Sequence, residues 1–121
     1  MEHPCPIRPE EHAVFRPDKM GKSTLFESER LLVGLNAFEP GQEHALHAHP
    51  GMDKLYLVLS GSGEFLLEGR ALPMQAGTLL VAPSGVPHGI RNGGAERLVV
   101  LAALAPGSQE LRGSADDTRV T

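Results

Sequence analysis

Glycine and proline interrupt this sequence so often that little room is left for a long helix. The 121 residues include 14 glycines and 10 prolines, and from Ser23 onward the apolar and β-branched residues form short runs between turn signals. This layout is typical of an all-β sandwich or barrel. Pro73 lies inside one of the runs and predicts an edge strand or a bulge there. The expected strands are 23–27, 30–38, 44–49, 54–60, 63–68, 71–75, 78–82, 87–91 and 98–105.

The length and the net charge of the chain argue against several classes of protein. The length suits one ordinary domain, and a net charge of -4 with a pI near 5.8 gives no basic surface for nucleic acid. The longest purely apolar run, 98–105, is far shorter than the ~20 residues of a membrane span. The first residues lack a secretory pattern, and the single cysteine, Cys5, has no partner for an internal disulfide. We therefore expect a cytoplasmic protein without nucleic-acid or membrane partners.

Three histidines have the spacing of metal ligands. His47 and His49 are two residues apart, so on one strand both imidazoles lie on the same face. His88 offers a third ligand, since it follows a strand-like run and a Pro-Ser-Gly turn at 83–85. Imidazole ligands suit zinc, iron, nickel or copper. The pattern predicts that the three side chains converge on one divalent ion.

With these residues in view, the chain resembles the cupin family. Cupins carry two motifs, the first built around a His-x-His pair and the second around Pro-x-Gly and a later histidine. The matching residues of the first motif are Gly41, His47, His49 and Gly61, and those of the second are Gly77, Pro83, Gly85, His88 and Asn92. The resemblance implies an antiparallel jelly-roll barrel, also called a double-stranded β-helix. We expect an N-terminal arm (1–21), the barrel (22–106) and a C-terminal tail (107–121), with one helical turn at 108–112.

The resemblance also implies a function. It suggests that His47, His49 and His88 bind Fe, Mn, Ni, Co or Zn, and that the protein acts on a small organic molecule as an oxygenase (a dioxygenase, for example), a lyase or an isomerase. Two alternatives stay open: a non-catalytic module that binds a small ligand, and a metal-free barrel whose histidines hydrogen-bond one another, water or a guest. Small cupins commonly pair their sheets, and the face that carries Leu55, Leu57 and Leu59 is apolar. We therefore expect a homodimer.

One position departs from the family pattern. Cupins usually have a ligand glutamate separated by six residues from the glycine that ends the first motif, and this chain has Lys54 there. A lysine adds positive charge instead of neutralising the metal, which favours an anionic guest such as a carboxylate. Tyr56 shares the face of Lys54, so both are candidate catalytic or guest-binding residues. The competing interpretation is that Lys54 pairs with Asp53 or another acid at the barrel rim.

Two other residues near the first motif are excluded from the site by their positions. His44 is an odd number of residues before His47, so strand alternation predicts that it points outward. Glu43 has the right parity but lies about 13 Å along the strand from His47, too far to replace the missing glutamate. Asn92 is expected to hydrogen-bond nearby backbone at a strand end rather than to bind metal.

Overall fold

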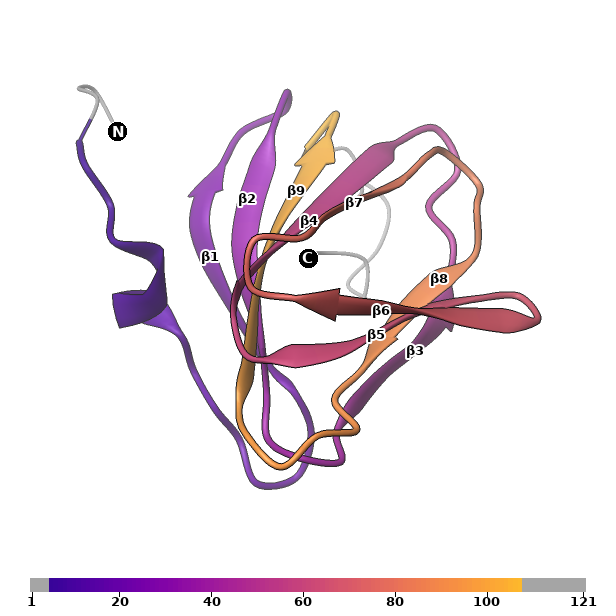
Figure 1. Ribbon diagram of the computed structural model, residues 1–121. Helices are drawn as coiled ribbons and strands as arrows, with labels where there is room; N and C mark the ends of the chain where they lie inside the picture. Colours follow the sequence, from indigo (N-terminus) through magenta and orange to yellow (C-terminus); the bar gives the residue numbers. More distant parts are fainter. Residues whose placement is uncertain (1–4, 108–121) are drawn as a thin grey trace.

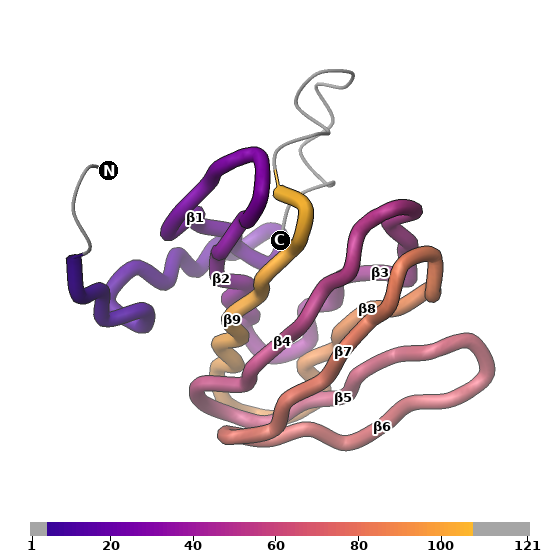
Figure 2. Tube along the Cα trace, turned by 90° about the horizontal axis from the view of Figure 1, so that it is seen from above, coloured from indigo at the N-terminus to yellow at the C-terminus, as the bar shows by residue number. Residues whose placement is uncertain are grey.

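The computed structural model describes residues 5–107, and within them the chain forms nine β-strands and one short 3-10 helix. Figures 1 and 2 show two sheets that face each other, with the strand orders β1-β2-β9-β4-β7 and β3-β8-β5-β6. All strand pairs are antiparallel, as in the predicted jelly-roll barrel. The elements are η1 (Pro9–His12), β1 (Gly21–Glu27), β2 (Leu32–Phe38), β3 (Glu43–His47), β4 (Asp53–Ser60), β5 (Ser62–Leu67), β6 (Arg70–Gln75), β7 (Leu79–Ala82), β8 (His88–Arg91) and β9 (Leu98–Ala105).

The strand predictions agree with this structure to within two residues at each end. Pro73 lies in β6, which is an edge strand of its sheet as predicted. The N-terminal arm contains one 3-10 turn, Pro9–His12. The predicted helical turn at 108–112 lies outside the described residues. No helix in the part of the chain that the structure describes is long and apolar enough to cross a bilayer.

Side chains alternate in direction along each strand, and this determines which residues point into the barrel. In β4, Tyr56 and Val58 are fully buried, whereas Leu55, which points to the opposite face, is 36% exposed. The inward residues of β4 meet those of β9, and together with side chains from the second sheet they form one apolar core. The core comprises Met20, Phe38, Tyr56, Val58, Phe65, Met74, Ala82, Ile90, Leu98, Val100 and Ala102.

Asn92 lies at the end of the barrel where β2 and β8 end, which we call the Asn92 end. Its side chain forms three hydrogen bonds there. Its side-chain nitrogen donates to the carbonyls of Phe38, at 3.2 Å, and Glu96, at 2.8 Å. Its side-chain oxygen accepts from the backbone N–H of Gly94 at 3.1 Å. These bonds confirm the predicted structural role of Asn92, and they join the two sheets at this end.

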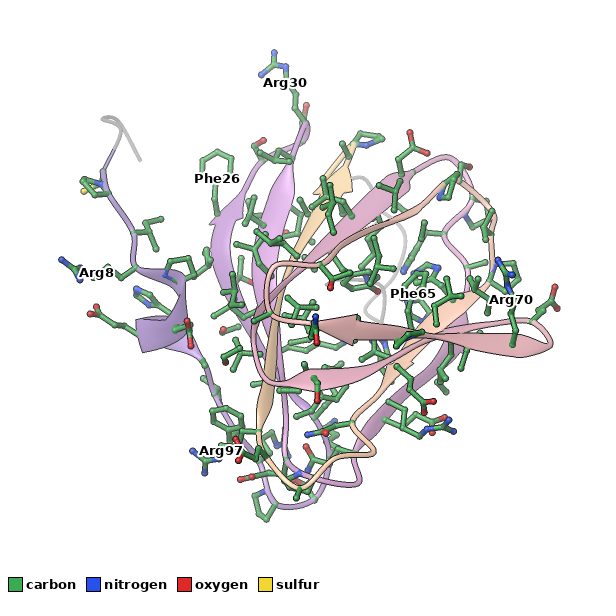
Figure 3. All side chains as sticks on the ribbon, viewed as in Figure 1. Arg8, Phe26, Arg30, Phe65, Arg70 and Arg97 are labelled. Atoms are coloured by element: carbon green, nitrogen blue, oxygen red, sulfur yellow. The ribbon has the colours of Figure 1, made fainter. Side chains whose placement is uncertain are left out.

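The N-terminal arm runs outside β1 in both views (Figures 1 and 2) and reaches the Asn92 end. There the guanidinium of Arg97 lies 4.1 Å from the centre of the Phe15 ring and also forms a two-point ion pair with Glu39. Figure 3 shows Arg97 at this edge of the molecule. The side-chain amide of Gln42 donates to the carbonyl of Arg16 at 2.7 Å. The arm therefore contacts the outside of the barrel, away from the histidines.

Candidate metal centre

The two cupin-like motifs place three histidines at the opposite end of the barrel, which we call the histidine end. His47 is the last residue of β3 and pairs directly with His88, the first residue of β8. His49 follows in the loop after β3. One ring nitrogen from each of the three lies within 4.8 Å of the others. The structure thus brings together the residues that the sequence spacing selects, although His49 reaches the group from a loop and not from the strand.

Two interlocked turns hold this loop in place. The backbone N–H of Gly51 donates to Ser84 Oγ at 2.7 Å, and the backbone N–H of Ser84 donates to Asp53 Oδ1 at 2.9 Å. Gly51 and Gly85 have φ of 81° and 80°, a left-handed conformation that glycine adopts without a steric penalty. The turn after β3 and the turn before β8 therefore fix each other, and with them the histidines at their ends.

The backbone sets the tautomer of two histidines. The Nδ1 atoms of His47 and His88 lie 2.8 Å from the carbonyl oxygens of Ala45 and Val86, so each Nδ1 carries the proton and donates it. Each Nε2 then keeps its lone pair. Among the described residues, the buried Nε2 atoms of His47, His49 and His88 have no hydrogen-bond partner. Three buried imidazoles with unpartnered Nε2 atoms fit a metal ion, and backbone carbonyls orient two of these ligands, His47 and His88, from behind.

The charge state of the cluster also fits metal binding. Burial lowers the pKa of His47 to about 4 and that of His49 to about 3, and it lowers the pKa of His88 as well. The nearby positive charge of Lys54 adds to the effect on all three. The imidazoles are therefore neutral at pH 7, which is the form that binds a metal. Neutral imidazoles suit Zn, Fe, Ni or Co, and three of them leave coordination positions for a guest.

Lys54 points into the barrel. Its side chain is 1% exposed, and its Nζ atom lies 4.9 Å from the centre of the Tyr56 ring. In the described part of the chain Nζ has no hydrogen-bond partner. Asp53 does not pair with it, because that carboxylate accepts the turn hydrogen bond from Ser84 and projects from the opposite face of β4. Burial, with a smaller effect from Lys22, lowers the pKa of Lys54 to about 7.

Tyr56 lies beside both Lys54 and His88. Its ring centre is 5.8 Å from that of His88 and 5.8 Å from that of Phe65, which is labelled in Figure 3. The hydroxyl is buried and has no hydrogen-bond partner within residues 5–107. Burial raises the pKa of this phenol, so it stays protonated. Tyr56 can therefore donate a hydrogen bond to a guest in the barrel.

The outward orientation predicted for His44 is wrong. The His44 ring stacks on the His47 ring with centres 4.2 Å apart, so both lie on the same side of β3. The cause is a shift in register: His44 pairs with Ile90 and His47 with His88, so two residues of β3 face one of β8. Gly89 makes the bulge possible, because a Cβ there would lie 2.5 Å from the carbonyl oxygen of His44. Glu43, as expected, stays exposed and outside the group.

Sequence reasoning also missed Asn36. It lies in the middle of β2, on the inner face with Phe38, and is fully buried. Neither its side-chain nitrogen nor its side-chain oxygen has a hydrogen-bond partner in the described structure. The signal was a single amide in the otherwise apolar run 32–38, at a position that alternation directs inward.

The fold and site together define a double-stranded β-helix protein with a cluster of histidines between its sheets. Residues 34–104 match the family described as "Cupin domain". The chain belongs to the cupin family.

Several relatives support this assignment. The chain is 32% identical over 85 residues to the "Oxalate-binding protein" of Thermotoga maritima, an alignment that covers 70% of this chain and 69% of that protein. A double-stranded β-helix protein from Klebsiella pneumoniae has a TM-score of 0.82 and 27% identity, over 87% of this chain and 92% of its own. The protein TT1209 from Thermus thermophilus has a TM-score of 0.76 and 37% identity, over 80% and 92%.

Proposed function

We propose that the protein binds one divalent metal ion through His47, His49 and His88 and captures a small organic anion beside it. The observation that carries this proposal is the set of three neutral imidazoles whose buried Nε2 atoms converge without partners in the described structure. The metal, when bound, supplies a Lewis acid for an oxygen atom of the guest. The barrel wall excludes water around this position, since His88, Lys54 and Tyr56 are almost fully buried.

The preference for an anion follows from the charges. Three neutral ligands leave the full dipositive charge of the ion uncompensated, and Lys54 adds a buried amine with no carboxylate partner among residues 5–107. A carboxylate offers oxygens to both centres, because it can bind the metal and accept hydrogen bonds from an ammonium group. The relative named "Oxalate-binding protein" supports a small anionic guest of this kind.

We propose turnover of the bound anion as a second step, in which Lys54 and Tyr56 are the candidate catalytic residues. A pKa of about 7 lets Lys54 exchange a proton near neutral pH. Tyr56 holds its proton and orients the guest by donating from its hydroxyl. Proton transfer of this kind favours a lyase or isomerase reaction over an oxygenase reaction. The competing hypothesis, binding without turnover, differs in that the bound acid is recovered unchanged after incubation.

The metal is tested by elemental analysis of protein purified without chelator or affinity metal, followed by thermal melts with added Fe, Mn, Ni, Co and Zn. We expect one ion per chain and a higher melting temperature, because an ion that binds only the folded state stabilises it by mass action. His88→Ala should abolish both effects. His12→Ala, which changes an exposed histidine of the arm, is the matched control. Unchanged melting with every metal would contradict the proposal.

The role of Lys54 is tested by two substitutions in the metal-loaded protein. Lys54→Glu should tighten zinc binding, because a carboxylate replaces an amine beside a dipositive ion, and it should weaken the binding of butyrate. Lys54→Ala should leave zinc binding nearly intact and weaken butyrate alone. Isothermal titration gives both affinities. If Lys54→Glu changes neither one, Lys54 does not act on the site, and the preference for an anion loses its main support.

We also propose that the chain forms a homodimer through the outer face of the larger sheet. Leu55, Leu79 and Val81 from β4 and β7 are 36%, 59% and 56% exposed there. Leu55 and Val81 line a shallow apolar hollow of about 160 Å³. A second copy related by a two-fold axis can cover this apolar face. Light scattering should give twice the chain mass of 12.9 kDa, and Val81→Lys should return a monomer.

A further inference from the structure

Asn36 carries an unexplained energetic cost. A buried side-chain amide that makes no hydrogen bond loses its hydration without compensation, and native proteins hold few such groups. Asn36 is fully buried, and no residue in 5–107 bonds either of its polar atoms. Leucine has the same branched shape and the same number of side-chain non-hydrogen atoms, and it would not carry this cost. An asparagine here therefore points to a ligand that the amide bonds.

The position of Asn36 places this amide inside the barrel. Across the sheet Asn36 pairs with Lys22 on one side and Val100 on the other, and Val100 belongs to the core. Residues paired across strands share a face, so Asn36 points inward with Val100. Asn36 is two residues before the end of β2, and His44 is one residue after the start of β3. The turn between these strands therefore brings both to the same level of the barrel.

His44 faces the same interior with a second unused atom. Its ring stacks on that of His47, and its Nδ1 atom is buried with no hydrogen-bond partner in the described structure. Because His47 is one of the three residues of the proposed metal site, the stacked ring of His44 borders that site directly.

We propose that Asn36 and His44 form a second binding position, next to the three-histidine site, for a hydroxyl group of the guest. This inference rests on the proposed function, in which the carboxylate of the same guest binds at the metal and Lys54. The guest is then a short hydroxy acid. Asn36 offers a donor and an acceptor, and the unpartnered Nδ1 atom of His44 offers one further hydrogen-bonding position. A hydroxyl group both donates and accepts, so it matches this pair, whereas a second carboxylate only accepts.

The test compares pairs of acids on the zinc-loaded, full-length protein by isothermal titration. The pairs are glycolate and acetate, 3-hydroxypropionate and propionate, and 4-hydroxybutyrate and butyrate. In at least one pair the hydroxy acid should bind about tenfold more tightly, because a buried polar site is left unpaired by the acid that lacks the hydroxyl. An α-hydroxyl can also chelate zinc directly. A preference for the hydroxy acid therefore supports the inference only if it is lost when Asn36 is replaced.

Asn36→Leu should reduce that preference to near unity and leave the affinity for the simple acid unchanged. The same variant should melt at a higher temperature without ligand, by about 4 °C or more, because an unpaired buried amide is removed. His44→Phe keeps a ring against His47 and tests the position independently, and it should lower the preference in the same pair of acids. Circular dichroism confirms that each variant is folded.

The outcomes separate the two proposals. If simple acids bind and the hydroxy acids gain nothing, or keep their gain in both variants, this inference is overturned and the proposed function stands. If no acid binds the zinc-loaded protein, both fail. A lower melting temperature for Asn36→Leu, with the preference unchanged, would show that the amide is structural and would also overturn the inference.

Discussion

Two buried asparagines in this barrel differ in nearly every respect except their burial. Both are fully inaccessible to solvent. Asn92 uses its side-chain nitrogen twice and its side-chain oxygen once in hydrogen bonds to backbone, whereas Asn36 uses neither atom within the described residues. The first residue stabilises the fold. The second lowers stability and leaves donor and acceptor atoms available in the interior.

The two ends of the barrel differ in the same way as the two asparagines, since one has paired polar groups and the other has unpaired ones. At the Asn92 end, charged groups are paired, as in the contact of Arg97 with Glu39. At the histidine end, Lys54, Tyr56 and three Nε2 atoms are buried without partners in residues 5–107. Proteins commonly give up stability at functional sites, where groups must be ready for a ligand. The comparison therefore places structural stability at one end and ligand binding at the other.

The largest change in stability is expected when Asn92 is replaced. Asn92→Leu should lower the free energy of unfolding by about 3 kcal/mol, because two carbonyls and one N–H lose a buried partner at about 1 kcal/mol each. Urea unfolding of the metal-free protein, followed by circular dichroism, measures this change. Asn36→Leu is the matched substitution and should raise the same quantity. Equal losses in the two variants would contradict the distinction between them.

Acid should weaken the histidine end selectively. His44, His47, His49 and His88 all have a pKa below 6.5, chiefly because they are buried. Below pH 6.5 the unfolded chain therefore binds more protons than the folded one, and the free energy of unfolding falls as the pH falls.

Allowing for the partial exposure of some of the rings, we expect a loss of at least about 2 kcal/mol between pH 7 and pH 5. Urea titrations with chelator present measure this loss, and His44→Phe should reduce it. His12→Ala should not, because that histidine is exposed in the arm. A stability that is flat over this range would show that the rings are accessible to protons in the folded state.

Anion binding should depend on pH through Lys54. Its pKa is about 7 without a metal, and a nearby dipositive ion lowers it further. The affinity of the zinc-loaded protein for butyrate should therefore fall as the pH rises through the pKa of Lys54, by up to about tenfold per pH unit, which is 1.4 kcal/mol. Lys54→Met should remove this dependence. A slope that persists in Lys54→Met would assign the titration to another group.

The smallest effect should come from the surface charges at the Asn92 end. The side chains of Arg97 and Glu39 are 59% and 32% exposed, and exposed ion pairs contribute about 0.2 to 1 kcal/mol. Arg97→Lys keeps the charge but removes the planar group that stacks on Phe15, so it should lose less than 1 kcal/mol in urea unfolding. A loss as large as that of Asn92→Leu would mean that the arm, and not the buried amide, stabilises this end.

The sequence predicts the fold well because its information is local. Turn residues mark each strand end, and the spacing of the two motifs selects His47, His49 and His88. The inward position of Lys54 was one of two options, and the decisive fact was tertiary: Asp53 is engaged by Ser84, more than 30 residues along the chain. Local patterns cannot show which distant group occupies a carboxylate.

The residues that sequence reasoning missed depend on contacts between strands. Alternation counts residues along β3, but the bulge changes that count, and its cause lies on β8 at Gly89. Asn92 forms the backbone hydrogen bonds expected at a strand end, whereas only the three-dimensional structure shows that the amide of Asn36 is buried without a partner in residues 5–107. Such features follow from the packing of the whole barrel.

The absence of a side chain at Gly89 affects which residues of β3 point into the barrel. A methyl group at this position would overlap the backbone of β3, so any larger residue would push the bulge aside. The simplest relief is a regular pairing of β3 with β8, which would rotate the imidazole of His44 out to solvent. The absence of a Cβ atom at position 89 on the neighbouring strand therefore determines whether His44 shares the inner wall with His47, His49 and His88.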